Sequence, residues 1–404
     1  MSIVFLSPTG KVGGAEAALH EMLAGLREQH PSWSLRLIVA SDGPLVARVE
    51  ALGVPVDILP FPDALARVGD WSVGEGVWAR TVFGARSLGA GPAALRYLRQ
   101  LRRRLHALTP SVIHTNGLKM HLLGAWARPR GAGLVWHFHD YAGRRAIART
   151  LLRRSVHKCD AIVANSRSVA EDAQRVCGTR VKTHSVWNAV DLDRFSPSGP
   201  RLDLDALAGL PPAGDDVLRV GLVATFARWK GHETFLNALG LLPTSLRVRG
   251  YVVGGPIYET SGGQVALRDL QSCAEALGLG ARVGFTGFVE DASAAMRALD
   301  VVVHASTDPE PFGLVIAEAM ACGKAVVASG AGGAIELTES GTNALTHDPG
   351  DARALAHRIE TLAADAGLRH RLGSAGRATA EQCFTRARMA LELTPIYQEL
   401  AHAH

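Results

Sequence analysis

The sequence predicts an α/β protein with two parallel sheets, each covered by helices. Short runs rich in β-branched residues alternate with helical patterns along the whole chain. Strands that are apolar on both faces and separated by helices are typical of parallel sheets. Because one domain usually holds roughly 100–200 residues, the 404 residues of this chain also favour two domains.

A break in the periodic pattern separates the two expected sheets. The runs before it are "SIVFLS", "LRLIVA", "VPVDIL", "SVIHT", "GLVWHF", "AIVANS" and "THSVW", and those after it are "LRVGLVAT", "LRVRGYVVGG", "RVGFTG", "VVVHAS", "AVVAS" and "NALTH". Proline, glycine and aspartate dominate residues 195–216. We therefore expect domains at 1–197 and 198–384, with a last helix at about 385–404 that returns to the first domain. Ligands of such sheets bind beyond the carboxyl ends of the strands, and the two sets of ends are expected to line one cleft.

Composition indicates a globular protein of a reducing compartment. Apolar residues make up 47% of the chain and charged residues 20%, which is ordinary for a soluble protein. The five cysteines are scattered without a C-x-x-C spacing, which argues against a disulfide framework or a zinc site. The N-terminal run lacks the features of a signal peptide, and no apolar run reaches the ~18–20 residues that span a bilayer. We expect a cytoplasmic protein.

Charge is divided unevenly along the chain. Residues 1–197 carry 26 Lys and Arg against 15 Asp and Glu, whereas the remainder carries 17 against 23. Arginine-rich amphipathic helices are expected at 93–108 and 143–158. They would contact an anionic membrane surface or an acidic acceptor, or else present solvated faces. No nucleic-acid partner is expected.

Two loops between a strand and a helix carry candidate anion-binding residues. The loop after the first strand contains Gly13 and Gly14, which let backbone N–H groups approach an anion at a helix N-terminus. A purely structural turn explains them equally well. In the second half, Arg228 and Lys230 stand between a strand and a helix, where cations can meet a diphosphate. A solvated surface cation pair is the alternative.

A third loop brackets a helix start with two glutamates, Glu310 and Glu318. We expect the backbone N–H groups of Phe312, Gly313 and Leu314 to point at a sugar-linked phosphate. Glu310 would then lie beside the sugar and Glu318 at the ribose hydroxyls, because a carboxylate accepts two hydroxyl protons. The alternatives are helix capping for Glu310 and a solvated helix face for Glu318. The apolar neighbours of Glu318 predict a largely buried carboxylate.

Taken in order, these motifs resemble the retaining glycosyltransferases of family four, which have the GT-B fold of two Rossmann-like domains facing a central cleft. The resemblance rests on "VGGAE", "WNAVDLDRF", "WKGHETFLNAL", "VGFTGFVED", "EPFGLVIAE" with its E-x7-E spacing, "GAGGAIEL" and "NALTHDPGD". It covers nearly the whole chain. It implies a nucleotide-diphosphate sugar as co-substrate and a glycan or lipid-linked precursor as acceptor. We expect no cofactor and no metal ion, because the cations and helix N–H groups of the loops would do the work of a metal.

The resemblance also implies roles for donor-side residues. It places donor-sugar hydroxyls at Glu310, ribose at Glu318 and the nucleotide base around Phe288 and Val289. The family usually has arginine five residues before the lysine of its diphosphate loop, but this chain has Thr225 there and its arginine at position 228. Lys230 is therefore the residue carried over directly, with Arg228 as a substitute from another backbone position.

On the acceptor side, the resemblance points to a histidine at the end of a first-domain strand. His139 with Asp140 fits this position in "VWHFHDY", and His137 is the alternative. His114 and Asn116 form a second pair at the end of another strand. A structural histidine remains the competing interpretation for each.

These expectations converge on a retaining, metal-independent hexosyltransferase, at the inner face of the plasma membrane if the basic helices bind lipid. We expect His139, Lys230 and Glu310 to act at the reacting centre, with the departing diphosphate stabilised by cations and helix amides. The alternatives are a nucleotide-sugar epimerase of the same fold and a non-catalytic GT-B binding module.

Two further segments carry expectations. Residues 61–93 interrupt the strand and helix rhythm and form either a mobile acceptor loop or a helical insertion, of which the second is favoured. Pro395 is expected to kink the last helix. Truncation after Thr394 is expected to abolish activity more than folding.

Overall fold

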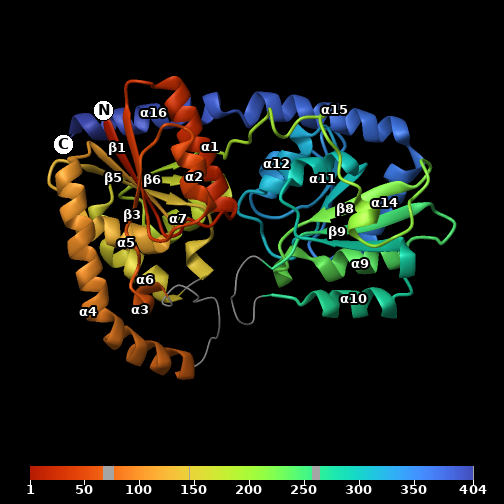
Figure 1. Ribbon diagram of the computed structural model, residues 1–404, viewed down its shortest axis with the longest axis horizontal. Helices are drawn as coiled ribbons and strands as arrows, with labels where there is room; N and C mark the ends of the chain where they lie inside the picture. Colours follow the sequence, from red (N-terminus) through yellow and green to blue (C-terminus); the bar gives the residue numbers. More distant parts are fainter. Residues whose placement is uncertain (67–76, 145, 257–263, 404) are drawn as a thin grey trace. The chain divides into compact units, whose positions relative to one another are not determined.

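The computed structural model describes residues 1–66, 77–144, 146–256 and 264–403. Contacts divide the chain into unit 1, Met1–Ala189 with Arg386–His404, and unit 2, Val190–Thr385 (Figure 1). The described strands form one parallel sheet in each unit, seven-stranded in unit 1 and six-stranded in unit 2. The predicted pair of Rossmann-like parallel sheets is confirmed.

Unit 1 has the strand order β3-β2-β1-β4-β5-β6-β7, and each pairing is parallel. Apolar side chains of α3 to α7 pack on one face of the sheet, and those of α1, α2 and α16 pack on the other. The strands are β1 (Ser2–Ser7), β2 (Ser34–Val39), β3 (Val56–Ile58), β4 (Val112–Asn116), β5 (Gly133–Phe138), β6 (Ala161–Ala164) and β7 (Lys182–Ser185). The helices are α1 (Gly14–Gln29), α2 (Pro44–Glu50), α3 (Asp63–Ala66), α4 (Val77–Leu108), α5 (Leu118–Ala127), α6 (Ala146–Ser155), α7 (Arg167–Cys177) and α16 (Arg386–Ala403), with 3₁₀ turns η2 (Ala142–Arg144) and η3 (Val156–Lys158).

Unit 2 has the parallel order β10-β9-β8-β11-β12-β13. Helices α9, α10 and α14 bury their apolar sides in one core with these strands, and α11 and α12 lie across the sheet from α9 and α10 (Figure 1). The strands are β8 (Leu218–Val223), β9 (Val248–Val253), β10 (Val283–Gly287), β11 (Val301–His304), β12 (Ala325–Ser329) and β13 (Leu345–His347). The helices are α8 (Leu204–Leu207), α9 (His232–Leu241), α10 (Leu267–Ala276), α11 (Ala292–Ala298), α12 (Leu314–Ala321), α13 (Ala334–Leu337), α14 (Ala352–Ala364) and α15 (Ala366–Cys383), with 3₁₀ turns η4 (Arg228–Lys230) and η5 (Gly280–Arg282).

Both sheets reverse their strand order at one place, between β1 and β4 in unit 1 and between β8 and β11 in unit 2. Loops that leave such neighbouring strands turn in opposite directions and open a crevice at the carboxyl edge, which is where ligands of these sheets bind. In unit 2 the two loops carry Lys230 and Glu310, and in unit 1 they carry Gly13 and Gly117. The fold thus brings the predicted loops to the switch point of each sheet.

The segment 61–93 is helical in its described part, since α3 covers 63–66 and α4 begins at Val77. The expectation for 67–76 lies outside the described residues. The last helix, α16, packs on α1 and continues through Pro395. Its residues Ile396, Tyr397 and Leu400 belong to the core of unit 1, so truncation after Thr394 would remove core side chains and is now expected to impair folding itself.

None of the helices within the described ranges is long and apolar enough to cross a membrane.

Candidate active site

The two loops at the switch point of unit 2 are locked together by close backbone packing. Gly231 follows η4 and is the N-cap of α9, with a φ of 73°. A Cβ atom at Gly231 would lie 1.8 Å from the carbonyl oxygen of Ala305, just after β11, so only glycine permits this approach. The N–H of Thr307 also donates to the carbonyl oxygen of Trp229 at 2.8 Å. The chain around η4 is therefore held against the loop that leads to Glu310.

Lys230 and Glu310 form an ion pair at this point. The Lys230 ammonium donates to Oε2 of Glu310 at 2.8 Å and to Oε1 at 3.1 Å. The side chain of Glu310 is 8% exposed and that of Lys230 is 20% exposed. The ammonium also lies 3.9 Å from the centroid of the Trp229 ring, where a cation is attracted to the π-electrons. A cation suited to phosphate and an anion suited to hydroxyls thus stand side by side.

His304 and Ser306 hold the same carboxylate from its buried side. Nε2 of His304 lies 2.9 Å from Oε2 of Glu310, and the Ser306 hydroxyl donates to that oxygen at 2.8 Å. Ser329 donates in turn to the carbonyl oxygen of Ser306 at 2.6 Å. Burial by itself would raise the pKa of Glu310, but the Lys230 ammonium and the His304 ring outweigh burial and hold the pKa below its ordinary value. Glu310 is therefore ionised at neutral pH.

The helix α12 begins directly behind Glu310. Gly313 caps it with a φ of 101°, and Leu314 is its first residue. First-turn N–H groups of a helix lack intrahelical acceptors and carry partial positive charge, which suits a phosphate oxygen. The side chain of Phe312 is buried against Phe384, with ring centroids 6.1 Å apart. Glu318 lies one turn into α12 and is half-buried, which is less than its apolar neighbours predicted.

The remaining donor-side residues lie nearer the surface. Arg228 is exposed on η4, and Thr225 is half-buried with its carbonyl oxygen accepting from the N–H of Ala227 at 2.7 Å. Phe288 follows β10 and is 65% exposed, beside the half-buried Val289. An exposed aromatic ring of this kind can stack on a nucleotide base.

In unit 1, the glycine loop ends at the start of α1. Gly13 is the N-cap of α1, and its N–H donates to the Glu16 carboxylate at 3.2 Å. Burial raises the pKa of Glu16, although hydrogen bonds from the N–H groups of Glu16 and Gly13 oppose the rise. The first helical residue is Gly14. An anion at Gly13 would have to displace Glu16 from this N–H.

His139 lies just beyond β5, stacked on His137 with ring centroids 4.0 Å apart and a 36° tilt. Neither ring nitrogen of His139 has a hydrogen-bond partner among the residues that the structure describes, and both nitrogens are buried. Burial lowers the pKa of His139 to about 4, so the ring is neutral at pH 7. The side-chain amide of Asn165 donates to the carbonyl oxygen of His139 at 3.3 Å. Asp140 is exposed and accepts from the N–H of Tyr141 at 2.8 Å.

The second histidine pair lies deeper. His114 is fully buried, with Nε2 at 3.1 Å from Nδ1 of His137 and Nδ1 at 2.9 Å from the hydroxyl oxygen of Tyr397. Asn116, at the end of β4, is 1% exposed, and its amide atoms contact no hydrogen-bonding group in the described part of the chain. His114 is therefore enclosed by β4, β5 and α16, where it can act only through His137.

Sequence reasoning missed three residues that hold the predicted ones. His304 and Ser306 were considered only as part of the strand "VVVHAS", although polar residues at the carboxyl end of a buried strand were an available signal. Tyr397 stands 283 positions after His114. No local pattern connects residues so far apart.

These features define a class: a protein of two Rossmann-like α/β units, with a lysine paired to a buried glutamate at a switch point that suits a phosphorylated sugar. Two family descriptions match the chain, "Glycosyltransferase Family 4" over residues 12–194 and "Glycosyl transferases group 1" over residues 212–379. The chain belongs to this family of group 1, family 4 glycosyltransferases.

Relatives agree with the family. The D-inositol 3-phosphate glycosyltransferase of Xylanimonas cellulosilytica is 37% identical over 231 residues, which cover 55% of this chain and 53% of the relative. The lipopolysaccharide core biosynthesis glycosyltransferase LpsE of Rhizobium meliloti is 32% identical over 273 residues, 66% of this chain and 73% of LpsE. The chain spans about half the length of the D-inositol 3-phosphate glycosyltransferases that it matches.

Solved structures agree as well. The crystal structure of HepE from Anabaena in complex with UDP and glucose is 27% identical and covers 98% of this chain and 99% of its own, with a TM-score of 0.78. The predicted GT-B fold is confirmed by this likeness together with the two parallel sheets.

Proposed function

We propose that the protein is a hexosyltransferase that moves a sugar, with retention and without a metal ion, from a nucleotide-diphosphate sugar to a hydroxyl of a glycan or lipid-linked acceptor. The observation that carries this proposal is the Lys230–Glu310 pair at the switch point of unit 2. A lysine ammonium binds diphosphate oxygens, and a carboxylate accepts hydrogen bonds from sugar hydroxyls. The likeness to HepE, which was crystallised with UDP and glucose, supports this class of donor.

The reaction breaks the bond between the anomeric carbon and the diphosphate oxygen and forms a bond from that carbon to the acceptor oxygen. Because the electron pair stays on the diphosphate, negative charge grows there. Lys230, Arg228 and the first-turn N–H groups of α12 would stabilise this charge, as a metal ion does in other sites. The acceptor hydroxyl approaches from the face that the diphosphate leaves, and its proton passes to the departing phosphate oxygen. His139 would lie near the reacting centre as a neutral hydrogen-bonding group.

Donor binding would exchange the partners of the ion pair. Lys230 would turn from Glu310 to the diphosphate, while hydroxyls of the donor sugar would replace the ammonium at Glu310. The carboxylate would keep its place because His304 and Ser306 hold Oε2 independently of Lys230. Glu318, one turn into α12, would bind the ribose hydroxyls.

The configuration of the released sugar tests this proposal without a known acceptor. The protein is incubated with UDP-, GDP- or ADP-glucose, with and without EDTA, while water serves as acceptor and proton NMR follows the anomers. We expect the α-anomer to appear first, at a rate that EDTA leaves unchanged. The β-anomer first would contradict retention, and inhibition by EDTA would contradict metal independence.

The same spectra separate the two alternatives. An epimerase would change the configuration of a ring hydroxyl before or during release. A binding module would hold the nucleotide sugar and turn none of it over. Either result would overturn transfer as the function.

We also propose that unit 1 contacts the anionic inner face of the plasma membrane. Helices α4, α5 and α6 lie next to one another on one face of the sheet (Figure 1), and the sequence has no acidic residue between Glu75 and Asp140. Trp126, at the end of α5, is 54% exposed, with the Lys158 ammonium 4.5 Å from its ring centroid. An exposed aromatic ring among cations is typical of side chains that lie at lipid headgroups.

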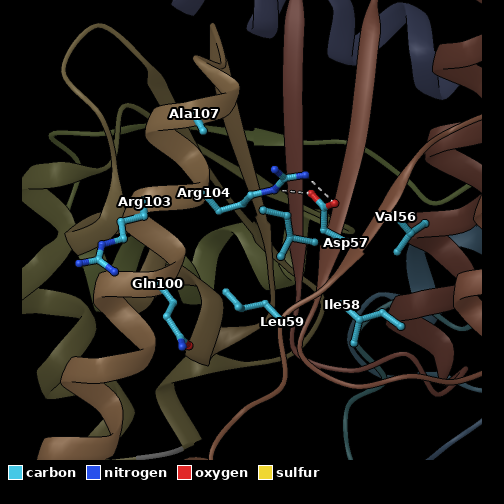
Figure 2. Close-up of a pocket in the computed structure, with 9 residues that line it drawn as sticks. Val56, Asp57, Ile58, Leu59, Gln100, Arg103, Arg104 and Ala107 are labelled. Carbon is cyan, nitrogen blue, oxygen red and sulfur yellow. Dashed lines mark hydrogen bonds and ion pairs between the residues drawn. The ribbon is translucent and has the colours of Figure 1, made fainter.

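The two flanks of α4 differ in a way that favours this surface. On one flank, Gln100, Arg104 and Ala107 face β3 and line a cavity of about 730 Å³, in which Arg104 is neutralised by Asp57 at 2.7 Å (Figure 2). Other side chains of α4 are exposed and do not line this cavity: Leu95, Arg99, Arg102 and His106. Arg99 and Arg102 thus add positive charge outside the cavity, whereas Arg103 lines it beside Arg104.

Sedimentation with vesicles tests the membrane contact. We expect binding to vesicles that contain phosphatidylglycerol and none to pure phosphatidylcholine. Arg96, Arg99 and Arg102 are all exposed on α4. Since each cation near an anionic surface contributes about 1 kcal/mol, the triple variant Arg96→Glu, Arg99→Glu, Arg102→Glu should lose most of this binding. A matched variant in unit 2, Arg268→Glu, Arg353→Glu, Arg371→Glu, has the same net charge and should retain it. Equal loss in both variants would contradict a defined surface.

A further inference from the structure

A chain of hydrogen-bonded rings runs through unit 1 from the last helix to the end of β5. Tyr397 of α16 lies 2.9 Å from Nδ1 of His114 on β4, and Nε2 of His114 lies 3.1 Å from Nδ1 of His137 on β5. The ring of His137 contacts that of His139, with a centroid separation of 4.0 Å and a 36° tilt. Tyr397, His114 and His137 are each 0% exposed. The three rings therefore form a relay whose far end lies beside the candidate reactive histidine.

The direction of the hydrogen bonds follows from the Tyr397 hydroxyl. That hydroxyl has two neighbours that can accept its hydrogen, Nδ1 of His114 at 2.9 Å and the Met22 sulfur at 3.8 Å. A thioether is a weak acceptor, so the hydroxyl donates to His114. Neutral His114 must then carry its own hydrogen on Nε2, which donates to Nδ1 of His137. His137 in turn must carry its hydrogen on Nε2.

Both relay histidines are neutral in the folded protein. Burial lowers the pKa of His114 to about 3 and lowers the pKa of His137 well below its ordinary value, with the neighbouring imidazoles adding to the effect. Each ring therefore holds one hydrogen and one lone pair. The hydrogen that the Tyr397 hydroxyl donates to His114 therefore sets the tautomers of both His114 and His137.

The relay ends in a donor without an acceptor. In the part of the chain that the structure describes, Nε2 of His137 has no hydrogen-bond partner, although the atom is buried. A buried N–H group that donates to nothing costs about 1–3 kcal/mol of stability, so such groups are normally paired with protein, water or ligand. Asn116 is the register partner of His137 in the sheet, and its amide is unpaired as well within the described residues. The surroundings are neutral and polar, which suits a hydroxyl oxygen.

We propose that Tyr397 and His114 are positioning residues that hold His137 in its Nε2–H tautomer, and that this N–H donates to a hydroxyl oxygen beside His139 and Asn116, from a bound sugar or from a buried water. The part of this proposal that names a sugar rests on the proposed function, and the tautomer of His137 does not. The hydrogen bonds from Tyr397 to His137 link α16 to the carboxyl edge of unit 1.

Nitrogen-15 NMR of the histidine rings tests the relay in the whole protein before any substrate is added. We expect His114 and His137 both to report hydrogen on Nε2 and a lone pair on Nδ1. A His137 ring with its hydrogen on Nδ1 would overturn the proposal. Saturation with UDP-glucose then distinguishes the two oxygen sources: a shift of the His137 Nε2 resonance indicates the sugar, and an unchanged resonance indicates water.

Two tyrosine variants separate positioning from packing. Tyr397→Phe removes the relay hydroxyl and should let both histidines exchange between tautomers. Tyr97→Phe is the matched control, because Tyr97 is also 0% exposed but lies in the core cluster on the opposite face of the sheet, and its hydroxyl has no partner among the described residues. We expect Tyr397→Phe to lower kcat for nucleoside diphosphate release about 3–10-fold, the range of one lost hydrogen bond, with the Kd for UDP unchanged. Equal spectra and rates in the two variants would overturn the relay.

Discussion

The carboxyl edges of the two sheets share one architecture but use opposite chemistry. In unit 2 the switch point holds an ion pair of Lys230 with the buried Glu310, whose carboxylate also has His304 and Ser306 as partners. In unit 1 the ends of β4 and β5 at the corresponding edge hold neutral rings and amides, of which His139 and Asn116 have unpaired polar atoms within the described residues. A charged edge suits the diphosphate of a donor, and a neutral edge suits hydroxyls.

This contrast separates two kinds of preorganisation. The charged edge is fixed by the strong bonds among its own groups, and a ligand must compete with them. At the neutral edge, Tyr397 and His114 hold His137 through buried hydrogen bonds. The unpaired polar atoms there can bind a ligand without displacing a protein partner. Variants in the two edges should therefore fail in different ways.

The largest effect is expected from the support behind the neutral edge. Removal of residues 395–404 deletes Ile396, Tyr397 and Leu400 from the core of unit 1. Since loss of one such side chain costs about 2–5 kcal/mol and a domain has only about 5–15 kcal/mol to lose, we expect unit 1 to unfold. Thermal unfolding followed by circular dichroism measures this. A truncated protein with an unchanged melting temperature would show that α16 is not part of the core.

At the charged edge, Lys230→Ala should abolish most activity while the protein stays folded. The substitution removes the cation that meets the diphosphate, and loss of one such stabilising group typically costs about 10²–10³ in rate. It also leaves Glu310 without its ammonium, so the pKa of Glu310 should rise. Lys230→Arg keeps the charge and should recover part of kcat. Equal kcat in wild type and Lys230→Ala would show that the Lys230–Glu310 ion pair has no role in catalysis.

Acid should act on the two edges in different pH ranges. Burial lowers the pKa of His139 from 6.5 to about 4. Between these two values the unfolded chain binds a proton at His139 and the folded protein does not. The free energy of unfolding therefore falls as pH drops from 6.5 toward 4. The lowered pKa of Glu310 acts in a lower pH range. Its contribution to the free energy of unfolding is full above the unfolded pKa of 4.5 and is lost only as pH falls below that value. We therefore expect the melting temperature to fall already between pH 7 and 5.

His139→Asn should lessen this first decline, to which buried His114 and His137 also contribute, while His106→Asn, at an exposed position, should leave it unchanged. Differential scanning calorimetry across the pH range gives the comparison. A melting temperature that is flat from pH 7 to 5 would contradict neutral burial of the unit 1 histidines.

Much of the fold could be predicted because its signals are local. Strands such as "GLVWHF" and "VVVHAS" are apolar at nearly every position, and helices between them require parallel pairing. The loop residues Lys230 and Glu310 were predictable from their place between a strand and a helix. Their mutual ion pair was not, because the two residues are 80 positions apart.

The support of the neutral edge could not be predicted for the same reason. His114 belongs to an ordinary strand pattern, and only the folded chain shows that α16 brings Tyr397 to its ring. Likewise, nothing in "VGGAE" indicates that Glu16 returns to the N–H of Gly13. Sequence patterns locate strand ends, whereas the partners that fix a side chain there come from distant elements.

Calorimetric titration with UDP-, GDP- and ADP-glucose, on wild type and Glu318→Ala, tests the central claim that the charged edge of unit 2 binds a nucleotide-sugar donor. We expect one nucleotide series to bind with micromolar affinity, and Glu318→Ala to weaken it about tenfold or more, since hydrogen bonds to a charged group contribute about 1.5–3 kcal/mol. Absence of binding by all three to the folded wild type, or equal affinity in the variant, would contradict the account.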